Sequence, residues 1–290
     1  MELNPGQLAA LVAIADEGSF EAAARRLQLT PSAVSQRIRA LETAAGRVLV
    51  SRTQPCELTE PGAELAKLGR QTALLLTEAE AALGEYAAAE LAVTVNADSL
   101  ATWLRPALVD IADWDAPVAL RLTIEDQEHS QELLRAGRVL AAVTSDPTAV
   151  QGCSVELLGT LRYLPVATRD FADRWRRGNR LDWARMPVVV FNAKDRLQHQ
   201  QLTARGIERP AVVHQVPSSS DFCAAVEAGL GWAMLPEPQI ADALARGEVV
   251  RLGRDRLDVP LYWQRWRLDS PLLDRLTEVV RAAALAGLRP

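Results

Sequence analysis

The spacing of the apolar residues changes its period around Tyr86–Glu90, and this change constrains the fold of the 290-residue chain more than any other feature. Before this segment, apolar residues recur every three or four positions, which is the period of an α-helix. After it, short apolar or alternating runs that are typical of β-strands are separated by helical segments. We therefore expect an all-α unit followed by a larger α/β unit, because one core rarely serves so long a chain.

Three short helices are predicted at the N-terminus. The first ends before Gly18, the second covers Phe20–Leu27, and the third runs from Pro31 to about Ala45. Thr30 is placed as the N-cap of the third helix, and proline is well tolerated at the first helical position, where its missing N–H has no partner to lose. These start and stop signals predict a compact bundle of three helices.

The third helix has two distinct faces. At about 100° per residue, its apolar residues fall on one side: Val34, Ile38, Leu41 and Ala45. The opposite side carries Ser32, Gln36, Arg39 and Thr43. Serine, glutamine and arginine hydrogen-bond phosphates and base edges, and an α-helix fits the major groove. We expect this face to bind DNA; an ordinary solvated helix face is the alternative.

The charge of the residues around this third helix favours DNA binding. Between Ala22 and Cys56 there are six arginines and one acidic residue, Glu42, so the local charge is +5 in a chain whose net charge is −5. The following segment, residues 48–53, reads as a strand, and a Gln54–Pro55 turn returns the chain through Leu58. The pattern predicts a β-hairpin wing that carries Arg52 to the DNA backbone.

A long helix is expected after the wing, from a Thr59 cap to about Tyr86. A three-four spacing places several of its residues on one seam: Leu65, Leu68, Thr72, Leu75, Ala79 and Ala82. The seam packs either on the same chain or on a second copy. We expect a dimer, because a small DNA-binding unit has little surface to cover so long a helix, and a two-fold dimer matches a two-half-site operator.

The α/β unit is expected to contain eight strands in mainly parallel sheets, at Leu91–Val95, Val118–Glu125, Val139–Thr144, Tyr163–Thr168, Val188–Phe191, Ala211–Val216, Trp232–Leu235 and Pro260–Trp266. Open α/β sheets bind ligands beyond the carboxyl ends of their strands. Four such ends carry polar side chains that form the candidate effector site: Asn96, Asp98, Ser99, Glu125, Asp126, His129, Thr144, Ser219 and Asp221.

These side chains suggest a ligand with charges of both signs. The helix start at Asn96–Ser99 favours an anion, whereas the acidic segment Glu125–His129 favours a cation. Ser219–Asp221 opens another helix and adds hydroxyl groups and a carboxylate. A basic amino acid carries both charges, so it fits this combination. The alternative is that Asp98, Ser99, Ser219 and Asp221 are helix caps and that the acidic segment is a solvated helix start.

The N-terminal residues resemble the winged helix-turn-helix of LysR-type transcriptional regulators. The run G-S-F-E-A-A-A-R-R-L-Q-L-T-P-S-A-V-S-Q-R-I-R-A-L-E, then G-R-V-L-V-S-R and L-T-E-P-G, carries the resemblance. It implies that the third helix is the recognition helix and that Arg52 lies in the wing. The residues expected to contact DNA are Arg25, Thr30, Ser32, Ser35, Gln36, Arg37, Arg39 and Arg52.

The remainder resembles one group within that family, the lysine- and arginine-responsive LysG/ArgP regulators, through V-N-A-D-S-L-A-T-W, I-E-D-Q-E-H and G-L-G-W-A-M-L-P-E among other segments. The resemblance implies a periplasmic-binding-protein-like domain of two subdomains with the effector in the cleft. It also implies crossover strands near Arg162–Val166 and Tyr262–Trp266. The expected domains are residues 1–59 (DNA-binding), 60–88 (linker helix) and 89–290, with subdomain one at 89–164 and 265–290 and subdomain two at 165–264.

Function follows from that resemblance as an expectation. The chain should bind operator DNA, sense lysine or arginine, with histidine as a third candidate effector, contact RNA polymerase, and activate a basic amino acid exporter gene as a homodimer or homotetramer. No cofactor or metal is expected. Rival interpretations are a regulator with a different effector, an architectural or replication-related DNA-binding protein, and an enzyme built around His129, Glu125 and Asp126. Without a signal peptide or a transmembrane segment, we expect a cytoplasmic protein.

Overall fold

The computed structural model describes residues 3–84, 88–115, 117–125 and 127–290. Its N-terminal part comprises α1 (Pro5–Glu17), α2 (Phe20–Arg26), α3 (Pro31–Ala45), β1 (Val50–Ser51), β2 (Glu57–Leu58) and α4 (Glu60–Ala82). The side chains of Ser19 and Thr30 cap α2 and α3, and Gly18 and Gly46 end α1 and α3 in the left-handed conformation. The three helices, the antiparallel wing and the long helix are therefore confirmed. The long helix ends at Ala82; its expected end at Tyr86 lies outside the described residues.

Two glycines of α4 allow the elements of the N-terminal part to pack closely together. α1 packs along α4, and a Cβ on Gly69 would lie 3.0 Å from Val12 Cγ2. A Cβ on Gly62 would lie 2.0 Å from the carbonyl oxygen of Leu49, at the start of the wing. Small residues here let the long helix approach both the bundle and the wing, so the three elements form one body around a shared apolar core.

The C-terminal part is α/β, with strands and helices mostly in alternation. The first elements are β3 (Ala89–Val95), α5 (Ala97–Ala101), α6 (Arg105–Ala112), β4 (Val118–Ile124), α7 (Gln127–Arg135), β5 (Ala141–Thr144), β6 (Cys153–Thr168) and α8 (Arg169–Arg174). A hairpin, β7 (Arg176–Arg177) and β8 (Arg180–Leu181), follows, then β9 (Val188–Val190), α9 (Leu197–Thr203), β10 (Val213–Gln215) and α10 (Ser219–Glu227). The last are β11 (Ala233–Pro236), α11 (Glu237–Arg246), β12 (Val249–Arg251), β13 (Leu257–Trp266) and α12 (Pro271–Gly287).

The sheets are mixed, so the expectation of mainly parallel sheets is wrong. The largest sheet has the order β11-β6-β13-β5-β3-β4, with β12 also pairing with β6. β3 is parallel to β4 and β5, and β9 is parallel to β10, but β13 runs antiparallel to both β5 and β6. The long antiparallel strands β6 and β13 arise because the chain crosses between two lobes and later returns along the same path.

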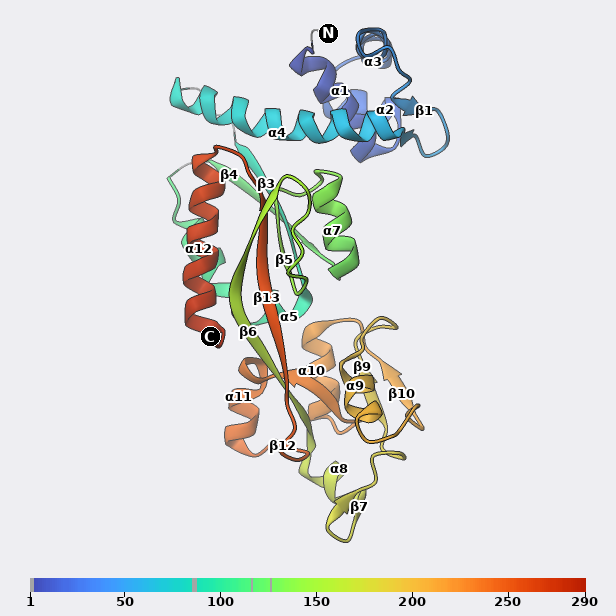
Figure 1. The fold of residues 1–290 in the computed structure, drawn as a ribbon, viewed down its shortest axis with the longest axis vertical. Helices are drawn as coiled ribbons and strands as arrows, with labels where there is room; N and C mark the ends of the chain where they lie inside the picture. The colour runs from blue at the N-terminus through green and yellow to red at the C-terminus, as the bar shows by residue number, and fades with distance from the viewer. Residues whose placement is uncertain (1–2, 85–87, 116, 126) are drawn as a thin grey trace.

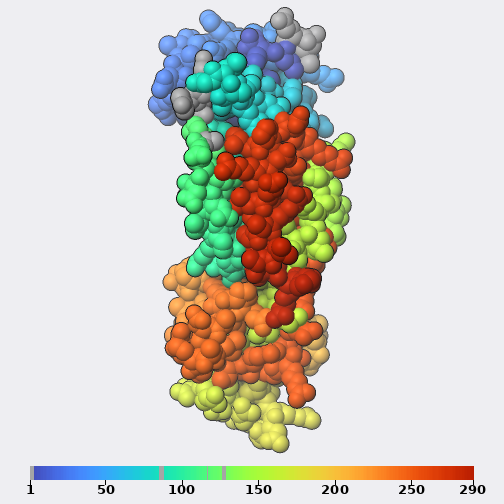
Figure 2. Space-filling view, turned by 90° about the vertical axis from the view of Figure 1, so that its left-hand side faces the viewer, coloured from blue at the N-terminus to red at the C-terminus, as the bar shows by residue number. Residues whose placement is uncertain are grey.

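Two lobes are strung along β6 and β13 (Figure 1). The proximal lobe, nearest α4, contains β3–β5, α5–α7 and α12; the distal lobe contains α8–α11 and β7–β12. Figure 2 shows α12, in red, across one face of the proximal lobe beneath the DNA-binding part. Both crossovers extend beyond their predicted segments, because β6 starts at Cys153 and β13 at Leu257. The subdomain boundaries fall within these shared strands and stay a prediction.

The predicted seam of α4 is largely uncovered in this single chain. Leu68 and Leu75 are each 39% exposed and the neighbouring Leu76 is 40% exposed, whereas Leu74 is buried on the opposite side toward the rest of the chain. Ala79 and Ala82 are also exposed. An apolar ridge of this kind is typical of a helix that packs against a partner. Within the described ranges, no helix is long and apolar enough to cross a membrane.

Candidate DNA interface and effector cleft

The polar face of α3 points away from the rest of the molecule. Ser32, Gln36 and Arg39 are exposed, whereas Val34 and Ile38 are buried against α1 and α2. Thr30 Oγ1 accepts a hydrogen bond from the backbone N–H of Ala33 at 3.2 Å, so Thr30 fixes the start of the helix. Because α3 ends the molecule on the side opposite the distal lobe (Figure 1), this face is open to a DNA duplex.

Arg37, which we expect to contact DNA, lies at the edge of that face. Its guanidinium donates to the carbonyl oxygen of Gly6 at 3.3 Å and is partly buried against the start of α1. The reason is its position on the helix, three residues after the buried Val34, which places it at the edge of the packed face. Arg37 therefore also braces α1 against α3. Arg25 is exposed and Ser35 is half-buried, and contact of these three residues with DNA stays a prediction.

The acidic residue of this arginine-rich region is turned away from the polar face. Glu42 Oε1 accepts a hydrogen bond from the backbone N–H of Leu49 at 2.9 Å, at the base of the wing. In the wing, the exposed Arg52 places its guanidinium 5.5 Å from the centre of the Phe20 ring. Glu42 thus ties the recognition helix to the wing, and the surface near α3 keeps its positive charge.

The first group of predicted effector residues forms the start of α5. The helix begins at Ala97 because Asn96 caps it: Asn96 Oδ1 accepts from the N–H of Ser99 at 2.7 Å. This N–H is therefore already bonded. The hydroxyl of the buried Ser99 has no hydrogen-bond partner in the described part of the chain. Asp98 lies in the first turn and faces β6.

Among the described carboxyl groups of the predicted effector site, Asp98 has the largest shift in pKa. It keeps some exposed surface, yet protein surrounds the carboxyl group, and this burial raises its pKa from 3.8 to about 6. The hydroxyl of Tyr163 donates to Asp98 Oδ2 at 2.8 Å and works against that rise, while the charge of Asp195 adds to it. Burial and the carboxylates of Asp98 and Asp195 raise the pKa of Tyr163 well above its usual value. These groups come from α5, β6 and the distal lobe.

The loop Asn192–Asp195 brings the distal lobe next to two groups of predicted effector residues. Asn192 Oδ1 accepts from the backbone N–H groups of Lys194 and Asp195, at 2.8 and 3.1 Å, which shapes the loop. At the other side of the loop, Lys194 Nζ lies 3.2 Å from His129 Nδ1, on α7 of the proximal lobe. One loop therefore reaches both the α5 group and the α7 group of predicted residues.

Sequence reasoning missed Tyr163, Lys194 and Asp195. The last two follow the strand that ends at Val190, so the search beyond strand ends could have found them had this end been included. Tyr163 lies within a crossover strand, and no local pattern marked it. Its role depends on β6 passing beside α5, which only the assembled fold brings about.

The other predicted residues lie around the same region with different environments. Glu125 is half-buried and follows β4, and Asp126 lies outside the described residues. Thr144 is buried at the end of β5, where its hydroxyl accepts from the N–H of Asp146 at 3.1 Å. Ser219 begins α10, which is capped by Ser218, and Ser219 contacts Gln239, whereas Asp221 is exposed in the first turn. α10 packs on α5, so these two groups of predicted residues lie on neighbouring helices.

Comparison with known proteins identifies this architecture. Residues 5–63 match the model of the bacterial regulatory helix-turn-helix protein, lysR family, and residues 84–285 match the LysR substrate binding domain. The chain belongs to the LysR family. It is a DNA-binding transcriptional regulator and not an enzyme, which settles the alternative built on His129. Among the described residues, no three His, Cys, Asp or Glu side chains are placed to bind a metal ion.

Relatives of this LysR-type regulator match it along its whole length. The lysine export transcriptional regulatory protein LysG of Corynebacterium efficiens is 50% identical over 290 residues, covering 99% of this chain and 100% of that protein. The structure of full-length LysG from Corynebacterium glutamicum with bound effector Arg is 47% identical, with a TM-score of 0.84 and coverage of 99% and 100%. ArgP from Mycobacterium tuberculosis is 46% identical, with a TM-score of 0.87 and 99% coverage of both chains.

In this LysR-type regulator, α4 connects the DNA-binding part to the proximal lobe. Arg70 Nη2 pairs with Asp16 of α1 at 2.5 Å, and Arg70 Nη1 donates to the carbonyl oxygen of Ala136 at 3.4 Å. One turn earlier, Lys67 Nζ lies 5.3 Å from the ring centre of Trp266, at the end of β13. Burial alone would raise the pKa of Asp16, but Arg70 and Arg26 hold it below its usual value. The contacts of Arg70 and Lys67 therefore link the proximal lobe to the helix bundle.

Proposed function

We propose that this regulator binds arginine or lysine in the cleft between its lobes and activates transcription of a basic amino acid exporter gene in response. The observation that carries the proposal is the Asp98 carboxyl group, whose pKa is raised to about 6 by burial and by the nearby charge of Asp195. In the described part of the chain no cation pairs with it. A site that concentrates buried negative charge is stabilised by a cationic ligand.

The two ends of a basic amino acid match the two sides of the cleft. A ligand ammonium or guanidinium beside Asp98 relieves the unfavourable burial of the carboxylate. The carboxylate of the ligand lies at the start of α10, where the first backbone N–H groups of the helix have no acceptor within the helix. α10 packs on α5, so a single small molecule spans both. Glu125, His129 and Thr144 complete the proposed surroundings.

The relatives support this choice of ligand. The Corynebacterium glutamicum LysG structure contains arginine as its effector, and the Corynebacterium efficiens relative is named for lysine export. From these names we extend the proposal to lysine as a second effector and to an exporter as the target gene. Histidine, a smaller basic amino acid, is proposed as a third effector. A regulator that acts on chromosomal DNA works in the cytoplasm, which is where excess amino acid would be sensed.

The assembly is proposed from the uncovered face of α4. Its exposed leucines, Leu68, Leu75 and Leu76, pack against the same helix of a second copy, which places two recognition helices on two half-sites of an operator. Two dimers then join into a tetramer through the effector lobes, and the DNA-bound assembly contacts RNA polymerase.

Effector binding reaches the DNA through the lobes and α4. β13 runs from the distal lobe to Trp266, whose ring lies under Lys67, and the end of α7 contacts Arg70 through Ala136. A ligand that draws the lobes together shifts these contacts, and the shift moves α4 with the recognition helix. The ligand changes operator binding only by its different affinity for the two arrangements of the lobes.

Isothermal titration calorimetry of the full chain tests the ligand assignment. Arginine, lysine, histidine and leucine are titrated into the wild type, into Asp98→Asn and into Asp242→Asn. Asp242 is exposed on α11 and serves as the matched control. We expect saturable binding of arginine and lysine, no binding of leucine, a loss of about ten-fold or more in Asp98→Asn, and no change in Asp242→Asn.

The result also separates the rival functions. Binding of none of the basic amino acids would refute the effector assignment and leave a LysR-type regulator of another small molecule. If the basic amino acids bind but operator footprints and reporter transcription do not respond to them, the regulatory proposal fails, and an architectural role on DNA is favoured.

A further inference from the structure

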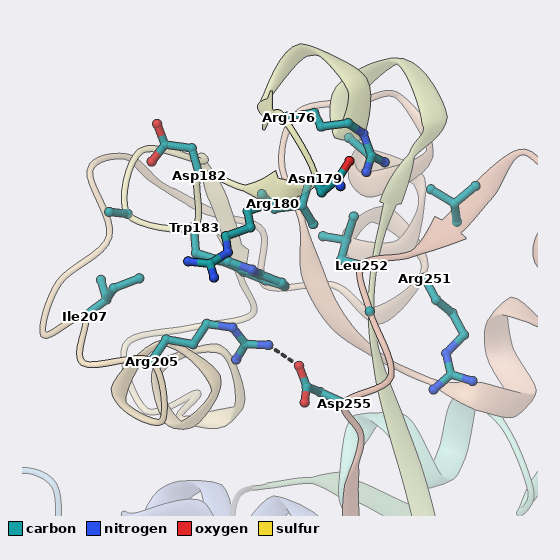
Figure 3. Close-up of a pocket in the computed structure, with 15 residues that line it drawn as sticks. Arg176, Asn179, Arg180, Asp182, Trp183, Arg205, Ile207, Arg251, Leu252 and Asp255 are labelled. Carbon is teal, nitrogen blue, oxygen red and sulfur yellow. Dashed lines mark hydrogen bonds and ion pairs between the residues drawn. The ribbon is translucent and has the colours of Figure 1, made fainter.

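The distal lobe carries a second pocket at the end of the molecule farthest from the DNA-binding part. Its volume is about 680 Å³. The β7–β8 hairpin, the end of α9 and the loop after β12 form its walls (Figure 3). Leu181, Ile207 and Leu252 give it apolar surface. A cavity of this size falls within the range, roughly 300–1,000 Å³, that holds small organic ligands.

Arginine dominates the polar lining of this pocket. Four arginines line it, Arg176, Arg180, Arg205 and Arg251, with two aspartates, Asp182 and Asp255. In Figure 3 the carboxylate of Asp182 points away from the arginines. Asp255 is paired with Arg205. The pocket therefore has more positive than negative charge, in a chain whose net charge is −5.

The four arginines differ in how far they are already engaged. The guanidinium of Arg205 lies 4.1 Å from the centre of the Trp183 ring and donates to the Gln201 carbonyl oxygen at 2.6 Å, so it is held in place. Arg176 makes only a long, exposed pair with Asp173, at 3.5 Å. Within the described ranges Arg180 forms no ion pair, and Figure 3 shows its side chain extending toward Trp183 inside the pocket.

The hairpin brings these two arginines to the pocket from opposite faces, because Arg176 lies opposite Leu181 in the register and Arg180 lies opposite Arg177. β7 and β8 are joined by a two-residue turn, Gly178–Asn179, with Gly178 at a φ of 58° that favours glycine. Arg177 lies opposite Arg180 in the strand register of the hairpin, yet it does not line the pocket. Arg177 is exposed and charged like Arg176 and Arg180 but lies outside the pocket lining, so Arg177→Ala is a matched control.

We propose that this pocket binds an organic phosphate of nucleotide size. Guanidinium groups match phosphate oxygens in charge and in paired hydrogen-bond geometry, so Arg176 and Arg180 hold the phosphate groups. The ordered Arg205–Trp183 stack and the apolar side chains of Leu252 and Ile207 contact the organic part. A bare inorganic anion would leave this apolar surface in water. The site is separate from the effector cleft and does not depend on its ligand.

Equilibrium binding of ADP to the full chain tests the proposal, with adenosine and inorganic phosphate as comparison ligands. ADP should bind saturably and more tightly than either comparison ligand, and added salt should weaken it. Arg180→Ala and Arg176→Ala should each reduce ADP affinity by about ten-fold or more, as expected for loss of a charge-assisted hydrogen bond. Arg177→Ala should retain the affinity of the wild type.

Two outcomes would overturn the proposal. One is the absence of saturable binding at millimolar ADP; the other is an equal loss in Arg177→Ala, which would show attraction by general surface charge. Inorganic phosphate binding as tightly as ADP would also refute the role of the apolar surface. Operator and arginine affinities are measured for each variant, so that misfolding of the distal lobe is distinguished from loss of the phosphate site.

Discussion

Replacing Asp98 by asparagine should stabilise the ligand-free protein at neutral pH while weakening effector binding. Asparagine retains an oxygen that can accept the hydrogen bond from Tyr163, now 2.8 Å from Asp98 Oδ2, but it removes the buried charge. The carboxylate of Asp98 that would bind a cationic ligand is therefore also a group whose burial destabilises the ligand-free protein. Such a conflict between stability and binding is expected at functional sites.

The magnitude follows from the pKa of Asp98. It is about 6 in the folded protein and 3.8 ordinarily. Between these values the folded state binds more protons than the unfolded state, so the free energy of unfolding decreases as the pH rises through about 4 to 6. At 1.36 kcal/mol per pH unit, this difference corresponds to at most about 3 kcal/mol, and residual solvent contact reduces it. Asp98→Asn should therefore raise the free energy of unfolding by up to this amount above about pH 7 and leave it unchanged near pH 4.

Urea denaturation of the ligand-free protein at several pH values, followed by tryptophan fluorescence, measures the effect. The difference in free energy of unfolding between Asp98→Asn and the wild type should grow from about pH 4 to pH 7 and then stay constant. Asp242→Asn provides the control for loss of an exposed charge. A difference that does not vary with pH, or a variant less stable than the wild type at neutral pH, would refute the reasoning.

Three further substitutions test other parts of the molecule. Arg39→Ala should weaken operator binding about ten-fold or more without changing arginine affinity; fluorescence anisotropy measures it, and unchanged operator binding would show that the polar face of α3 does not read DNA. Gly62→Ala should lower the free energy of unfolding by about 1–3 kcal/mol, because the added Cβ would lie 2.0 Å from the Leu49 carbonyl oxygen; an unchanged urea midpoint would contradict this packing. Asp16→Asn should leave arginine affinity intact but reduce the effect of arginine on operator affinity, since the charge that holds Arg70 is lost. The pKa of Asp16 is lowered in the folded state, so its stabilisation is present at neutral pH and is lost as the pH falls through that lowered pKa.

Much of the fold could be predicted because its signals act over a few residues. The caps at Ser19 and Thr30 and the glycine stops after α1 and α3 decide where helices begin and end, and apolar periodicity decides which face is buried. The same local signals located most strands of the lobes. They did not predict the length of β6, where Gly159 has a φ of 142° within the strand and lies against the C-terminal residues of the chain.

Local sequence patterns located the polar residues of α3 more completely than the contact residues of the predicted effector cleft. On α3, the helical period alone placed Ser32, Gln36 and Arg39 outward, whereas the hydrogen bond of Arg37 to Gly6 depends on the neighbouring helix α1. The contact residues of the cleft stay a prediction, since their ligand contacts depend on the bound state.

The sequence by itself determined the element boundaries, the arginine-rich polar face and the polar ends of several strands, because each depends on neighbours along the chain. Only the tertiary structure decided that Tyr163, Asp98 and Asp195 share one site, that β13 returns antiparallel along β6, and that Lys67 meets Trp266. These contacts join segments far apart in sequence. They arise from the packing of whole lobes, and no local pattern encodes which of many possible distant partners a side chain will meet.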